Sequence, residues 1–148
     1  MQLGSGTYDL ITGLTYTDHS GAWGWGGQWR SVSRLGENDE HYSRGDEHRL
    51  QGWISYLANE SLSLSGRLGY YDRGDIDGID PAIRAPAQTA DPSRQGVRQI
   101  DLGLGANYLL PGHRHRMSLE LTVPIAQNLD GPQLETDWAI TLGWQFAP

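Results

Sequence analysis

The sequence contains no cysteine, so it offers no disulfide framework, no thiolate metal site and no cysteine nucleophile. It also lacks lysine, and all eleven of its basic residues are arginine. The net charge of -7 leaves no basic stripe that could neutralise phosphates. We therefore expect no nucleic-acid partner.

Long hydrophobic runs are missing as well. The mean hydropathy is -0.54, and no apolar run approaches the roughly 20 residues that a membrane-spanning helix needs. No segment keeps a helical period of 3.6 residues, and the 20 glycines disfavour helices further. These absences exclude a helical membrane protein, but they leave an all-β chain open.

What the sequence does contain is alternation. Near the C-terminus every second residue is large and apolar, at Trp138, Ile140, Leu142, Trp144 and Phe146. A strand sends successive side chains to opposite faces, so this segment has one apolar and one polar face. The same pattern predicts seven strands, near residues 7–16, 22–34, 47–58, 61–71, 97–110, 115–126 and 135–146.

Two features favour a membrane barrel over a soluble sandwich, in which the apolar faces would pack inward. Glycines on the polar faces, such as Gly103 and Gly105, fit a crowded barrel interior. Aromatic residues gather near strand ends, as in the girdles of lipid-facing barrels. The membrane-interface aromatics that we predict are Tyr8, Tyr16, Trp23, Trp25, Tyr70, Tyr108, Trp138, Trp144 and Phe146.

The expected connections alternate in length. Residues 17–21, 59–60 and 111–114 form short turns, whereas residues 36–46, 72–96 and 127–134 form long polar loops. Outer-membrane barrels have short periplasmic turns and long external loops, so we expect the long loops outside the cell.

The expected fold is an all-β, antiparallel, up-and-down transmembrane barrel formed by residues 1–148 as a single domain or segment. Complete bacterial barrels have an even number of strands and both termini in the periplasm. Seven strands therefore predict the C-terminal part of a larger barrel. Missing upstream strands or other chains would close it, since open edges do not persist in lipid.

Several motifs resemble, in order, the C-terminal half of a Gram-negative outer-membrane transporter family, the channels associated with meta-pathway phenol degradation. The motifs lie at residues 3–10, 36–39, 74–81, 90–92 and 129–138. The resemblance implies an outer-membrane location, a lipid bilayer as partner, and passive passage of small, hydrophobic or aromatic solutes.

Ionisable residues on the polar faces are the functional candidates. Such residues either line a water-filled path or form an ion-pair lattice that fills the barrel. We expect Arg67 to pair with Asp101, and Arg116 or Glu120 to pair with Asp137. The predicted lumen-lining residues are Asp9, Arg30, Arg49, Arg67, Asp101, Arg116, Glu120 and Asp137.

Other chemistry finds less support. The acidic loop with Asp72, Asp75, Asp77 and Asp80 is a weak candidate for a hard cation, because it lacks the spacing of an EF-hand. The histidine pairs His41/His48 and His113/His115 are weak candidates for a transition metal. No motif implies a cofactor, and no nucleophile stands beside a base in a Gly-x-Ser-x-Gly elbow, so no enzyme is expected.

Three functions stay open at this point. The first is a channel or facilitator, the second is a soluble β-sandwich or barrel that binds a flat ligand on tryptophans, and the third is a structural β protein that assembles edge to edge. Trp53 is the awkward residue, because it shares a face with Arg49, Gln51 and Ser55. Either a bulge or a soluble fold would explain its position.

Overall fold

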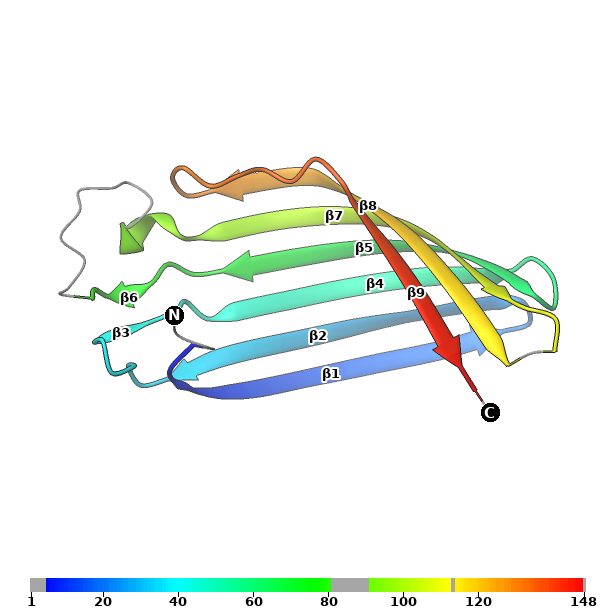
Figure 1. Cartoon of the computed structure of the whole chain (residues 1–148), viewed down its shortest axis with the longest axis horizontal. Helices are drawn as coiled ribbons and strands as arrows, with labels where there is room; N and C mark the ends of the chain where they lie inside the picture. Colours follow the sequence, from blue (N-terminus) through cyan, green and yellow to red (C-terminus); the bar gives the residue numbers. More distant parts are fainter. Residues whose placement is uncertain (1–4, 81–90, 113, 148) are drawn as a thin grey trace.

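A computed structural model describes residues 5–80, 91–112 and 114–147 of the chain. Its main feature is one antiparallel sheet in which neighbours in the sequence are neighbours in space (Figure 1). The seven strands are β1 (Tyr8–Ser20), β2 (Trp23–Leu35), β4 (Glu47–Leu57), β5 (Leu62–Arg73), β7 (Val97–Leu109), β8 (His115–Leu129) and β9 (Ala139–Phe146). The antiparallel all-β architecture expected from the alternation is confirmed.

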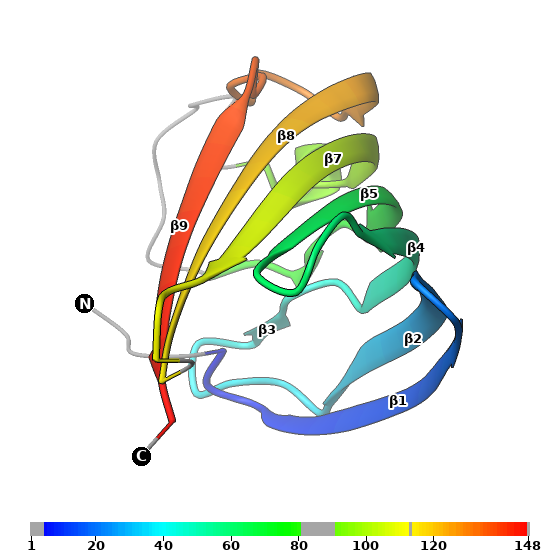
Figure 2. The ribbon, with the colours of Figure 1, turned by 90° about the vertical axis from the view of Figure 1, so that its right-hand side faces the viewer.

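The sheet curls into a half-barrel that is open along one side (Figure 2). Its strand order runs from β1 to β9, and these two strands form the edges of the sheet in the described residues. Six successive antiparallel pairings separate them, so β1 and β9 run in the same direction. The half-barrel therefore ends on two parallel edges.

The two ends of the half-barrel differ, as the loop lengths predicted (Figure 1). Connections at residues 21–22, 58–61 and 110–112 lie at one end, which we call the short-turn end. Those at residues 36–46, 74–80, 91–96 and 130–138 lie at the other, the long-loop end. Two boundaries were wrong: β1 continues through Ser20, because Gly21 forms the turn with a φ of 57°, and β9 begins at Ala139.

The long loops carry a small structure of their own. In them β3 (Tyr42–Ser43) pairs with β6 (Asp77–Gly78), and a 3-10 turn, η2, covers Pro92–Arg94. Asp91 caps that turn, and hydrogen bonds from the Ser93 hydroxyl and backbone lower the pKa of its carboxyl. The long polar loops thus contain a short strand pair and a 3-10 turn.

A hydrophobic core is missing from the described part of the chain. Val32 and Val97 are its only buried apolar residues, and it contains no fully buried large side chain. No helix in the described ranges is long and apolar enough to cross a membrane. The sheet is held together by its hydrogen-bonded strand pairs rather than by an apolar interior.

Candidate functional site

The outward-curving, convex face of the sheet is apolar and exposed. Strand register assembles its side chains into rows that cross the sheet, such as Trp25, Ile54, Gly66, Leu104, Leu121 and Ile140. Leu142 is 77% exposed and Trp144 is 66% exposed. On β7 the apolar stretch runs from Ile100 to Tyr108, and nine residues is the length of a membrane-spanning strand.

Charge is almost absent from this apolar band. Between the row of Leu14 and Trp29 and the row of Tyr108 and Trp144, Asp18 is the only charged residue on the convex face of the described strands. Asp18 lies near the short-turn end of an edge strand and accepts a hydrogen bond from the Tyr16 hydroxyl at 3.1 Å. The band thus has one ionisable defect, on its edge strand β1.

Most of the predicted interface aromatics flank this band. Tyr70 borders it towards the long-loop end, and Trp23, Tyr108, Trp144 and Phe146 border it towards the short-turn end. Trp25 and Tyr16 lie further inside the band, Tyr8 lies beyond it towards the long loops, and Trp138 precedes β9. All nine are exposed. Whether they contact a membrane interface stays a prediction.

The opposite, concave face is polar. Seven of the eight predicted lumen-lining residues alternate onto it, and the exception is Asp137, which lies outside β9. Side chains two strands apart meet on this face, as Arg67 of β5 and Glu120 of β8 do across β7. Such contacts require the inward curvature. The expected pairing of Asp137 with Arg116 or Glu120 is absent, because Gln145 and Thr141 are the β9 neighbours of those residues.

One ion-pair cluster lies towards the long loops. Arg34 binds Asp9 on β1 with Nη1 and Glu47 on β4 with Nη2, the latter at 2.9 Å. The Arg34 side chain is only 10% exposed. A single guanidinium therefore joins three adjacent strands.

A second cluster lies midway along the sheet. Arg67 donates hydrogen bonds to Glu120 and to the Thr122 hydroxyl, at 3.3 Å for its Nε–Oε2 contact with Glu120. It passes over Gly103, where an added Cβ would lie 3.2 Å from the Arg67 Nη2. The expected partner Asp101 instead accepts a hydrogen bond from Gln99 at 2.6 Å. Because Gly103 has no side chain, the Arg67 side chain can cross β7 and reach Glu120 rather than Asp101.

The remaining arginines of this face have weaker partners. The Arg49 guanidinium stacks on the Tyr71 ring, 4.4 Å from its centroid. Arg73 donates to the Gln95 carbonyl at 2.9 Å. Arg30 faces Arg49 directly across the β2–β4 pair, with no ion pair to another described residue. The concave face therefore carries arginine charges that are not paired with a carboxylate in the described part of the chain.

Trp53 occupies the concave face, and the bulge offered as one explanation for its position is absent. The register of β4 with β2 and β5 is continuous, and Trp53 faces Gly26. A Cβ at Gly26 would collide with the indole and would lie 2.7 Å from the Tyr16 carbonyl. Gly26 is thus the gap that admits a large ring among polar neighbours.

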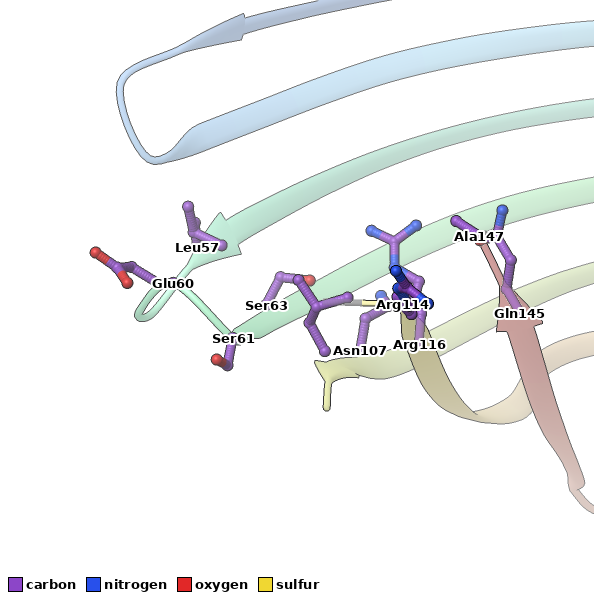
Figure 3. Close-up of a pocket in the computed structure, with 10 residues that line it drawn as sticks. Leu57, Glu60, Ser61, Ser63, Asn107, Arg114, Arg116, Gln145 and Ala147 are labelled. Atoms are coloured by element: carbon purple, nitrogen blue, oxygen red, sulfur yellow. The ribbon is translucent and has the colours of Figure 1, made fainter. Parts of the chain in front are cut away.

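A cavity of about 320 Å³ opens on the concave face at the short-turn end (Figure 3). Its size falls within the range of small-molecule sites, about 300–1,000 Å³. The lining residues come from β4 through β9 and the two turns between them: Leu57, Glu60, Ser61, Ser63, Asn107, Leu109, Arg114, Arg116, Gln145 and Ala147. Sequence reasoning found Arg116 but missed the cavity, because the site depends on curvature.

The weak metal candidates are not brought together. Asp72 pairs with Arg98, and Asp75 accepts hydrogen bonds from the backbone of Gln95 and Gly96. His48 bonds to Ser31, and His115 stacks between Trp144 and Phe146. His113 lies outside the described residues. No group of three or more potential metal ligands occurs in the described ranges.

The chain matches no family model, no curated protein and no solved structure. The resemblance to outer-membrane transporters therefore rests on the sequence motifs alone.

Proposed function

We propose that this half-barrel is part of the wall of an outer-membrane β-barrel channel or facilitator, through which small solutes pass without energy input. The observation that supports this most strongly is the inverted arrangement of the sheet, with apolar side chains exposed on the convex face and charged ones gathered on the concave face. A water-soluble sheet would place these chemistries the other way round.

A lipid bilayer is the partner whose chemistry fits the convex face. Contiguous exposed apolar patches of more than a few hundred Å² mark interaction sites. A protein partner would cover a patch of limited extent, whereas the apolar band continues from β1 to β9. Its height of nine residues on β7 and its aromatic margins are those of a membrane-spanning strand.

Strand parity indicates how the barrel closes. Lipid offers no partner for the backbone groups of an open edge, so β1 and β9 need neighbours. Because these edges are parallel, an odd number of further strands would complete an antiparallel barrel with an even total. The strands could belong to the same polypeptide or to another chain.

The concave face supports passage rather than a solid plug. Its ion pairs lie along the wall, and Arg30, Arg49 and Arg116 form no ion pairs within the described residues. Fixed charges that line a water-filled path select solutes by charge and size. The motif resemblance points to small hydrophobic or aromatic solutes, and the long loops would then face the cell exterior.

Two single-tryptophan variants test the membrane assignment. In each, the other five tryptophans are replaced by phenylalanine, leaving either Trp29 on the convex face or Trp53 on the concave face. We expect brominated lipids to quench Trp29 in reconstituted protein, and aqueous iodide to quench Trp53. A chain that stays in solution without detergent, or lipid quenching that is equal for both residues, would contradict the proposal.

Conductance of the full chain in planar bilayers then tests the channel itself. We expect discrete current steps whose ion selectivity changes when Arg30 or Arg49 is replaced by glutamine. If the protein inserts into the membrane but does not conduct, the assignment to a barrel wall stands and the proposed passage of solutes is rejected.

A further inference from the structure

The short-turn cavity contains an excess of hydrogen-bond donors. Arg114 and Arg116 both line it, as do the amide side chains of Asn107 and Gln145 (Figure 3). Neither arginine forms an ion pair or a side-chain hydrogen bond to any other described residue. This contrasts with Arg34 and Arg67, whose guanidiniums are held by carboxylates on the same face.

Amide groups complete the polar side of the cavity. Gln145 on β9 faces Arg116 on β8, and Asn107 on β7 faces Ser118, two residues further along β8. The Asn107 and Gln145 side chains also form no hydrogen bond within the described part of the chain. Two amides from β7 and β9 thus line the cavity together with Arg116 of β8 and Arg114, which directly precedes β8, and all four have unused bonding capacity. Neighbouring like charges are unfavourable unless an anion offsets them.

Apolar side chains also line the cavity. Leu57 belongs to β4, Leu109 faces Arg116 across the β7–β8 pair, and the Ala147 backbone N–H donates to the Arg114 carbonyl at 2.9 Å. Glu60 is the only acidic lining residue, and Figure 3 shows the Glu60 carboxylate directed away from the two arginines. The cavity lining therefore combines two cations with apolar side chains.

We propose that this cavity binds a small organic anion that has one carboxylate and an apolar body. The carboxylate lies between Arg114 and Arg116, since guanidinium forks bind carboxylates with two parallel hydrogen bonds. Asn107 and Gln145 donate to its remaining lone pairs, and the apolar body packs against Leu57 and Leu109. The inference deepens the proposed function, because it places a solute-selecting site at the short-turn mouth of the passage.

Calorimetric titration of the detergent-solubilised full chain tests the site, with benzoate as the probe. Benzamide, a neutral analogue, and inorganic phosphate, an anion without an apolar body, serve as comparison ligands. We expect benzoate to bind at least about tenfold more tightly than either, because only benzoate offers both a charged acceptor for the guanidinium groups and an apolar ring. Equal binding of benzamide or of phosphate would overturn the assignment.

Matched variants separate the site from general charge effects. R114Q and R116Q should each weaken benzoate binding about tenfold, whereas R98Q, which removes the same charge from the convex face, should leave it unchanged. E60Q should leave binding unchanged or strengthen it. If R98Q weakened benzoate binding as much as R114Q or R116Q does, the effect would come from net charge alone, and the site would be contradicted. Circular dichroism and heat-modifiable gel mobility confirm that each variant is folded.

The failure of this inference differs from failure of the channel. Titration needs no bilayer, so benzoate binding without conductance would retain the site and reject the passage. Conductance without any benzoate binding would support the channel and reject the anion site.

Discussion

Along β7, Leu102 and Leu104 point outwards from the half-barrel, whereas Gly103 and Gly105, which alternate with them, face the concave side. The same contrast separates the two faces of the whole sheet: the convex face carries bulky apolar groups that contact little, and the concave face carries small residues crossed by long charged ones. On the concave face, glycine therefore makes room for arginine and tryptophan side chains. On the convex face, the apolar side chains are exposed and available for contacts outside the chain.

The largest effect is expected from a charge placed on the convex face. Ile140 and Thr141 are adjacent on β9 but face opposite sides. Ile140→Arg should destabilise the membrane-inserted protein by about 2–4 kcal/mol, because the residue lies on the apolar face, in one register row with Leu104 and Leu121. Thr141→Arg should cost much less. Urea titration in lipid vesicles measures both, and equal costs would erase the distinction between the faces.

Glycine substitutions should divide in the same way, with a smaller effect. Gly26→Ala would force a methyl group against Trp53 and the Tyr16 carbonyl, and overpacking of this kind costs about 1–3 kcal/mol. Gly66→Ala on the convex face meets nothing within 4 Å and should be tolerated. The free energy of unfolding distinguishes them. Adding Trp53→Ala to Gly26→Ala should recover part of the loss, and no recovery would argue against Trp53 as its cause.

The ion pair of Arg67 and Glu120 should contribute about 1 kcal/mol, because both side chains are partly exposed to water. A double-mutant cycle with Arg67→Met and Glu120→Gln isolates the coupling energy. The same cycle with Arg67→Met and Asp101→Asn should give a smaller value. A larger coupling to Asp101 would restore the pairing expected from the sequence.

The smallest effect concerns Asp18, the one charge in the convex apolar band. Asp18→Asn keeps the side-chain shape and the hydrogen bond from Tyr16 while removing the charge. Insertion stability should rise by less than about 1 kcal/mol, because Asp18 lies near the short-turn end of the edge strand β1. Thermal unfolding in vesicles at neutral pH measures the change. A loss of stability would show that the carboxylate has a partner in the assembled barrel.

Much of the fold was predictable because strands impose a period of two. The alternation around Leu102 and Leu119 placed the strands to within a few residues, and the clusters of turn residues separated short connections from long ones. The ends of β1 and β9 were less accurate, because Asp18 and His19 read as turn residues and Trp138 as strand, whereas backbone pairing decides both ends.

The sequence predicted which face of the sheet carries the charged residues, but not which of these residues meet there. Parity assigned seven of the eight charged candidates to the concave side, but it could not say which carboxylate Arg67 reaches. That choice depends on register, on the gap at Gly103, and on curvature that brings β5 and β8 together. The cavity of Arg114 and Arg116 escaped sequence reasoning for the same reason, since its walls extend from β4 to β9.

The strands, their two chemically opposite faces and the alternation of turns and loops could be derived from the sequence, because these features depend on neighbours along the chain. The degree of curling, the partners of each arginine and the cavity at the short-turn end could be seen only in the folded sheet. Those features join residues that are distant in sequence, and only the register and bending of the sheet set the distances between them.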